Sequence, residues 1–283
     1  MHYRQFAQQI AISVAIVLVA SNAGGAESSS SKDWRPLFNG KDLSGWHVVL
    51  ADEDKGIAPE KIFQVHDGLI HVYQDVPQGA EVPFGYLATD GNYSWYHLKL
   101  EYRWRANRFA SRTERPRDAG ILYHASAEKR VWPRSVECQI QEGDTGDCFT
   151  VHGTQVQTTV DPVKLKSGVH HCLSAKDGGV DDIWGGPSIA RIVKSATRER
   201  DDWNTVEVIV RGAEEVIHRV NGYEVFRAKN LKQLDTDEKT WIPLTSGLVL
   251  LQAEFAEVQY RNINIKPIEG RPLQLSESAP PPK

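Results

Sequence analysis

Hydrophobic and polar residues alternate with a period of two along much of this chain. The clearest case is residues 96–105, where aromatic and aliphatic side chains occupy every even position and charged or polar side chains occupy every odd one. In a pleated strand, successive side chains point to opposite faces. The pattern therefore predicts an antiparallel strand with one face in a core and the other in water.

Shorter runs of the same kind recur, separated by turn residues. They predict strands at residues 46–50, 62–65, 69–73, 84–89, 119–124, 149–160, 205–210, 215–220, 223–226, 247–252 and 256–266. Asp67-Gly68 and Asn221-Gly222 separate neighbouring runs and predict tight hairpins. No segment of ten or more residues shows helical apolar spacing. We expect an all-β fold of two antiparallel sheets packed face to face.

The alternation fails between residues 174 and 202. This part of the chain is rich in glycine and charge, and it has few large apolar residues. A long connection of that kind in a compact domain is typical of a functional lid or a mobile insert.

Residues 135–147 (SVECQIQEGDTGD) combine a polar strand face with an acidic turn. A strand here places Glu137, Gln139 and Gln141 on one face and apolar residues on the other. The turn after it carries Asp144 and Asp147, and carboxylates of an irregular loop are the ligands that calcium prefers. A calcium site and an ordinary acidic turn both remain open interpretations.

The amino terminus predicts a secretory signal. Residues 10–20 are apolar, a basic residue precedes them, and small residues follow at 21–26. The apolar run is shorter than the ~20 residues that a membrane span needs. We therefore expect a signal peptide at 1–26, with an uncleaved anchor as the alternative. A disordered leader (27–32), one domain (33–268) and a disordered tail (269–283) complete the expected organisation, and the mature protein should be secreted or periplasmic and not bound to a membrane.

The net charge and the cysteine content limit the function further. A formal net charge of −4 gives no electrostatic basis for binding nucleic acid. Cys138, Cys148 and Cys172 allow one disulfide in an oxidising compartment. We expect Cys148–Cys172, because Cys138 should point into the core. The cysteines do not have Cys-x-x-Cys spacing, so a structural zinc site is not expected.

With these elements in order, residues 34–46 (WRPLFNGKDLSGW) resemble the amino-terminal signature of the 3-keto-disaccharide hydrolase family. The similarity continues through residues 101–103, 118–121, 137–140, 202–204, 221–222 and 259–263, and it covers roughly 33–268. The resemblance implies a jelly roll of the concanavalin A-like lectin and glucanase type. It also implies activity on sugars whose C3 hydroxyl has been oxidised to a ketone.

The chain departs from the family pattern at two places. Asp118 begins a segment (DAGI) whose usual form in the family starts with asparagine, and His124 stands where an arginine is expected. Residues 251–257 are also more acidic than in many relatives. These departures bear on the substrate that the chain accepts.

Conventional two-carboxylate cleavage is disfavoured on the polar strand itself. Retaining glucanases of this fold need two close carboxyl groups, and the positions that alternate with Glu137 are the amides Gln139 and Gln141. A 3-keto sugar requires less, because its ketone acidifies the proton on C2. A single base can remove that proton, the group on C1 leaves by β-elimination, and water adds afterwards.

The resemblance and this chemistry give each candidate a role. Glu137 is the predicted base. His124 or Arg103 would stabilise the enolate oxygen, and Glu254 or His124 would protonate the leaving group. Gln139 and Gln252 suit sugar hydroxyls, since amides both donate and accept hydrogen bonds.

Several tryptophans are candidates for stacking on a sugar ring: Trp203 first, with Trp46, Trp132 and Trp184. Three hypotheses remain open at this point, all with a saccharide as partner. They are a hydrolase or lyase acting on 3-keto-glycosides, a non-catalytic carbohydrate-binding module, and a conventional glycosidase that uses Glu137 with Glu254 or Glu142.

Overall fold

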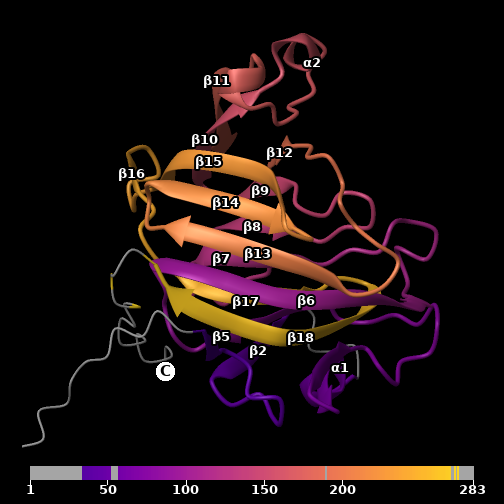
Figure 1. Cartoon of the computed structure of the whole chain (residues 1–283). Helices are drawn as coiled ribbons and strands as arrows, with labels where there is room; N and C mark the ends of the chain where they lie inside the picture. Colours follow the sequence, from indigo (N-terminus) through magenta and orange to yellow (C-terminus); the bar gives the residue numbers. More distant parts are fainter. Residues whose placement is uncertain (1–33, 52–56, 189, 269–270, 272, 274–283) are drawn as a thin grey trace, which may run out of the picture.

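The computed structural model describes residues 34–51, 57–188, 190–268, 271 and 273, and its strands form two antiparallel sheets packed face to face (Figure 1). This arrangement confirms the expected all-β two-sheet sandwich. The predicted signal peptide and leader lie outside the described residues, as does the predicted tail apart from Arg271 and Leu273.

The larger sheet has the order β11-β10-β15-β14-β13-β6-β18-β4-β3, with β1 paired to β18 and β16 paired to β15. Its strands are β1 (Arg35–Pro36), β3 (Phe63–His66), β4 (Leu69–Val72), β6 (Trp95–Arg108), β10 (Thr154–Val160), β11 (Val180–Gly186), β13 (Asn204–Arg211), β14 (Glu215–Val220), β15 (Tyr223–Leu234), β16 (Trp241–Pro243) and β18 (Ala256–Pro267).

The smaller sheet has the order β12-β9-β8-β7-β17-β5-β2. Its strands are β2 (Trp46–Leu50), β5 (Gly85–Thr89), β7 (Gly120–Ala125), β8 (Ser135–Gln139), β9 (Cys148–Val151), β12 (Ala190–Val193) and β17 (Leu248–Ala253). The helices are short: α1 (Pro59–Ile62), α2 (Pro162–Lys166) and the 3-10 turn η2 (Ala175–Asp177). Across the described ranges, no helix has the length and apolar character needed to cross a membrane.

The core lies between the sheets, and the alternation along the strands determines which residues enter it. In β6, the even-numbered residues from Tyr96 to Tyr102 are fully buried, as predicted. Both expected hairpins are present, β3–β4 through Asp67-Gly68 and β14–β15 through Asn221-Gly222. All four of these turn residues have positive φ, which tight hairpin turns require.

Two segments differ from the sequence-based expectation. Residues 149–160 form two strands in different sheets, because the chain reverses at His152-Gly153, both at positive φ. The expected insert at 174–202 contains two strands, β11 paired with β10 and β12 paired with β9. Figure 1 shows α2 and β11 projecting from the top of the sandwich.

The strand with the polar face, β8, lies in the smaller sheet between β7 and β9. Val136 and Cys138 join the core cluster between the sheets, together with Ile140 just after the strand. Glu137 and Gln139 alternate with them and therefore face away from the core. The candidate chemistry is thus placed on the outer face of the smaller sheet.

Candidate functional site

Glu137 and Gln252 meet above Gly120 on the outer face of the smaller sheet. Gly120 is the cross-strand partner of Gln139. A β-carbon added to Gly120 would lie 2.2 Å from Glu137 Oε1 and 2.4 Å from Gln252 Oε1. Two polar side chains therefore occupy the space that a larger residue at position 120 would take. Gln139, Glu137 and Gln252 are each at most 6% exposed.

Arg112 joins a second pair of acids beside this position. Asp118 and Glu254 face each other in an isolated antiparallel bridge. The Arg112 guanidinium forms an ion pair with Asp118 and another with Glu254 Oε1, at 3.3 Å. It also donates to Gln141 Oε1 at 3.3 Å. We refer to Asp118, Glu137, Glu254 and Arg112 as the carboxylate cluster.

Burial and mutual repulsion keep protons on this cluster. Burial raises the pKa of Glu137 well above its ordinary value, and the nearby Glu254 and Asp118 raise it further, while a hydrogen bond from Gln252 opposes the rise. Burial and Asp118 raise the pKa of Glu254 to about 8, and Arg112 limits the increase. The cluster can therefore give up and take back protons near neutral pH, which is the property that acid–base catalysis requires.

Aromatic side chains lie next to the cluster. Phe255 follows Glu254 in the chain, and its ring centroid lies 5.2 Å from that of Phe84, which is 5.9 Å from Trp132. Tyr86 donates from its hydroxyl to the carbonyls of residues 128 and 130, which fixes the loop that carries Trp132. Ligand sites commonly combine such apolar rings with a few polar groups.

The other tryptophans considered for stacking lie elsewhere. Trp46 is buried in the core, and the Trp184 ring lies 3.7 Å from His170. Trp203 lies between two guanidinium groups on the outer face of the larger sheet, 4.6 Å from Arg103 and 3.7 Å from Arg261. Among these residues, only Trp132 is positioned near the carboxylate cluster.

His124 is not part of the cluster. Its ring is 1% exposed, hydrogen-bonds to the Gly212 carbonyl at 3.0 Å, and contacts the core residue Tyr96. Burial lowers its pKa to about 4. The strand is irregular here, since His124 has φ of 51° and the β7–β17 register shifts. Ala125 therefore takes the outward position, and His124 turns toward the larger sheet.

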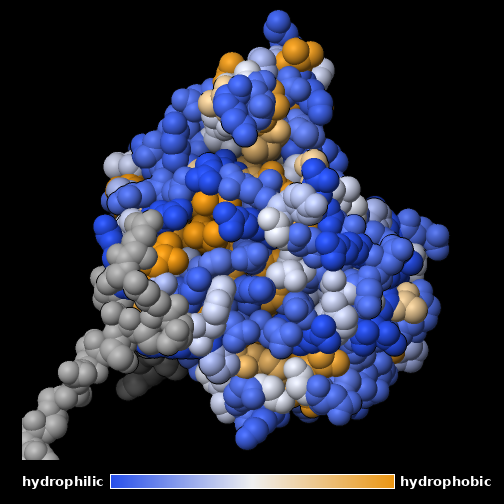
Figure 2. Space-filling view, in the orientation of Figure 1, coloured by the Kyte–Doolittle hydropathy of each residue, from blue (hydrophilic) through white to orange (hydrophobic). Residues whose placement is uncertain are grey.

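Arg103 is also separate from the cluster, because β6 belongs to the other sheet. Its Nε donates to Gln259 Oε1 at 2.7 Å, and Gln259 is its cross-strand partner. Gln259 in turn contacts His71, which hydrogen-bonds to Glu257 at 2.6 Å. These residues lie on the outer face of the larger sheet, which Figure 2 shows to be mostly hydrophilic. The predicted alternation of β6 is correct, but its wet face is on the opposite side of the molecule from Glu137.

The acidic turn after β8 is held by protein groups. Asp144 accepts from Gln141 at 2.8 Å and pairs with Lys194 at 3.1 Å. Asp147 is fully buried and accepts from the Ser195 backbone at 2.6 Å. No group of three metal-ligating side chains is found within the described ranges. These contacts attach the segment around Lys194 to the turn, and the calcium site expected from the sequence stays a prediction.

The three cysteines are all free thiols in this structure. The expected Cys148–Cys172 disulfide is therefore absent. Cys138 and Cys148 face each other across β8 and β9 and are fully buried, whereas Cys172 is partly exposed.

Sequence reasoning brought together Glu137, Gln139, Gln252 and Glu254, but it missed two members of the site. In the sequence, Asp118 stands out only as a departure from a family pattern, and Arg112 does not stand out at all. A signal for Asp118 existed, since it lies two residues before Gly120 and so shares its strand face. No local signal identifies Arg112 among the neighbouring arginines.

A cavity of about 460 Å³ lies between β10, β15 and residues 171–175, and it shares no residue with the carboxylate cluster. Its charged lining is largely paired: Arg227 binds Glu224 at 2.8 Å and also contacts Glu215. Volume alone suits a small ligand, but proton-transfer groups converge at the carboxylate cluster. The carboxylate cluster is therefore the candidate functional site.

Comparison with known proteins supports a carbohydrate-active protein. The sequence model of the 3-keto-alpha-glucoside-1,2-lyase-like domain matches residues 33–266. Two structures of candidate glycosyl hydrolases from Parabacteroides distasonis are similar. One is 20% identical, and the match covers 86% of this chain and 97% of that chain with a TM-score of 0.49. The other is 15% identical, and the match covers 83% of this chain and 100% of that chain with a TM-score of 0.47. A carbohydrate-binding module from Bacillus subtilis is similar at 8% identity, and the match covers 78% of this chain and 95% of that chain with a TM-score of 0.40. No curated protein matches the chain. Over the described residues the fold is an antiparallel two-sheet sandwich, as expected.

Proposed function

Because the chain belongs to the 3-keto-alpha-glucoside-1,2-lyase-like family, we propose that it cleaves the glycosidic bond of a 3-keto-glycoside by β-elimination. The observation that carries this proposal is the carboxylate cluster: three acids share one sheet face with a single guanidinium, and two of the acids have raised pKa values. Elimination needs a base, an acid and a positive group at the developing oxyanion. The cluster contains a candidate for each of these.

The proton on C2 is removed by Glu254. A base is most effective when its pKa lies near the working pH, and the pKa of Glu254 is about 8. The side chain of Glu254 is 19% exposed and so can reach a substrate. The C2–H bond breaks, its electrons form the enolate with its charge at O3, and Arg112 stabilises that charge.

The leaving group is protonated by Glu137. Burial raises the pKa of Glu137 well above its ordinary value and so favours the protonated form, which is why this residue starts the reaction as an acid. As the C1–O bond breaks, the glycosidic oxygen takes the proton from Glu137, and the sugar is left with a C1–C2 double bond. Water then adds at C1 and gives one proton to the ionised Glu137, and the proton carried by Glu254 returns to C2. These roles for Glu137 and Glu254 are the reverse of those expected from the sequence, because burial was not visible there.

Gln139 and Gln252 hold the sugar hydroxyls. Gln252 Oε1 is buried and has no hydrogen-bond partner among the described residues, so it can accept from a hydroxyl of the substrate. The rings of Trp132, Phe84 and Phe255 provide an apolar surface beside the reacting carbon. We also propose export from the cytoplasm, on the basis of the signal-like residues 1–26.

One experiment separates the three hypotheses. Purified protein is incubated with a 3-keto-glucoside and, in parallel, with the unoxidised parent glucoside, and release of the leaving group is followed by chromatography. Selective cleavage of the ketone supports elimination. Cleavage of the parent would instead indicate a conventional glycosidase, and binding without cleavage of either compound would indicate a binding module.

A further inference from the structure

We propose that Glu142 is a positioning residue, which holds Arg112 over the carboxylate cluster by fixing both ends of the loop that carries it. We call residues 108–117 the arginine loop. The inference rests on the proposed function, because it concerns the positive charge that Arg112 supplies to the carboxylate cluster. It assigns a role to an acid that itself lies outside the cluster.

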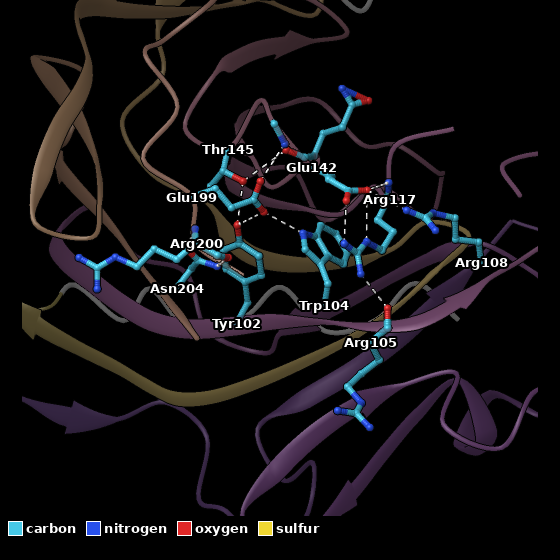
Figure 3. Close-up of polar contacts among 12 residues, drawn as sticks. Tyr102, Trp104, Arg105, Arg108, Arg117, Glu142, Thr145, Glu199, Arg200 and Asn204 are labelled. Atoms are coloured by element: carbon cyan, nitrogen blue, oxygen red, sulfur yellow. Dashed lines mark hydrogen bonds and ion pairs between the residues drawn. The ribbon is translucent and has the colours of Figure 1, made fainter. Parts of the chain in front are cut away.

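Glu142 binds the first and last residues of the arginine loop (Figure 3). Arg117 donates to it three times: from Nη2 to Oε1 at 2.7 Å, and from Nε and from the backbone to Oε2 at 3.2 Å. Arg108 Nη2 donates to Oε2 at 3.1 Å. The Glu142 backbone N–H donates back to the Arg117 carbonyl at 2.9 Å. One carboxylate therefore closes the loop.

The charge on Glu142 is present at every working pH. Its hydrogen bonds with Arg117 lower its pKa to about 2. Such charge-assisted bonds to a forked guanidinium fix orientation as well as distance. The loop ends are thus held by an interaction that does not switch off as the cluster titrates.

The interior of the loop leaves Arg112 little freedom. Phe109 is fully buried, and its N–H donates to the Phe255 carbonyl at 3.0 Å. Ser111 adopts the left-handed conformation, with φ of 73°. The Arg112 N–H donates to the Phe109 carbonyl at 3.0 Å. With both ends fixed, this turn directs the Arg112 side chain to Asp118 and Glu254.

Two consecutive residues after β8 take arginines from the same loop. Gln141 accepts from Arg112, and Glu142 accepts from Arg117. The end of β8 therefore sets the position of the loop relative to Glu137 and Gln139 on that strand. Glu199 supports this end by accepting from the Gly143 N–H at 2.7 Å and from Trp104 Nε1 at 2.8 Å (Figure 3).

Loss of the Glu142 charge should raise the pKa of Glu254. Arg112 lowers that pKa through its charge, and a loosened loop weakens the effect. If Glu254 is the base, the rising limb of activity against pH then moves to higher pH. A residue that only stabilises the fold would lower the melting temperature without moving this limb.

The test compares Glu142→Gln with Glu114→Gln, which removes the same charge from an exposed residue of the same loop. Two quantities are measured: the pKa of Glu254 in the free protein, by NMR of carboxyl-labelled glutamate assigned with Glu254→Gln, and the pH profile of kcat/KM on a 3-keto-glucoside. We expect both to rise by about one pH unit in Glu142→Gln, no change in Glu114→Gln, and partial recovery in Glu142→Asp.

An unchanged pKa of Glu254 in folded Glu142→Gln would overturn the inference. If that variant does not fold, Arg108→Met removes one end of the contact, and it should give a smaller shift in the same direction. No shift in folded Arg108→Met would then overturn the inference equally. If the wild-type protein does not cleave the substrate but the NMR shift is found, the proposed function fails and the positioning role stands.

Discussion

Asp118 and Glu254 form a single antiparallel bridge at the edge of the paired region of β7 and β17, and Arg112 contacts both carboxyl groups. Two like-charged side chains at this separation cannot both be ionised cheaply when they are buried. Burial is the main cause of the raised pKa of Glu254, the charge of Asp118 adds to the rise, and the charge of Arg112 opposes it.

Substitution of the two glutamates should separate the two proton transfers. In Glu254→Gln we expect no exchange of the C2 proton of a 3-keto-glucoside with deuterated solvent, because the base is gone. In Glu137→Gln exchange should continue while cleavage falls by about 10²-fold or more, since general acid catalysis contributes on that order. Proton NMR of the substrate in deuterated water measures both. The opposite pattern would make Glu137 the base.

Gly120→Ala should disable the site without a change in its chemical groups. The added methyl would lie closer to Glu137 Oε1 and Gln252 Oε1 than van der Waals contact allows. Both contacts are with the far ends of flexible side chains, so Glu137 and Gln252 must shift while the fold itself loses little stability. Gly186→Ala is the matched control, because nothing lies within 4 Å of its added methyl. The cleavage assay should show a loss in the first variant only, while urea unfolding should show both variants folded; equal activity of the two would contradict the packing of the site.

The raised pKa values should make the fold less stable as pH increases. Below about pH 4.5 Glu254 is neutral in both the folded and unfolded chain, and its contribution is fully present. Between there and about pH 8 the unfolded chain ionises first, so the free energy of unfolding falls by up to about 1.4 kcal/mol per pH unit.

The variant Glu254→Gln should lose less stability than the wild type over this range. Urea unfolding at intervals between about pH 5 and about pH 8 measures the difference. Parallel pH dependence in the two proteins would show that Glu254 titrates normally in the folded state.

Thiol accessibility should follow burial. The pKa of the Cys138 and Cys148 thiols is raised well above the ordinary value by burial, and only Cys172 is partly exposed. We expect a thiol reagent to modify at most Cys172 in the folded protein, and all three cysteines after denaturation without reductant. Recovery of a single thiol under denaturing conditions would reveal a disulfide. Cys172→Ser should remove the reactivity of the folded state.

Much of the site could be inferred from local pattern. Glu137 and Gln139 share a face because β8 is regular, and Gln252 and Glu254 share one because β17 and its continuation are extended. Whether these two faces coincide depends on both strands belonging to the same sheet. Local pattern does not show this, and the structure places β8 and β17 on either side of β7.

The misplaced residues show what a local pattern omits. His124 follows a regular alternating run, but a shift in the register of β7 against β17 turns its side chain toward the core. Arg103 lies on the solvent-facing side of its strand, as expected, but that strand belongs to the larger sheet and not to the sheet that carries Glu137. Alternation predicts which side chains share a face, but it does not predict the sheet to which the face belongs. Arg112 reaches Glu254 across a long separation in the chain, and such contacts depend on the path of a whole loop.

The position of β18 sets the order in which the chain can fold. This last strand lies inside the larger sheet, between β6 and β4, and it also pairs with β1 at the start of the domain. The central pairing of this sheet therefore cannot form before residue 267 has left the ribosome. A stop codon shortly before residue 256 should abolish the native state instead of shortening an edge.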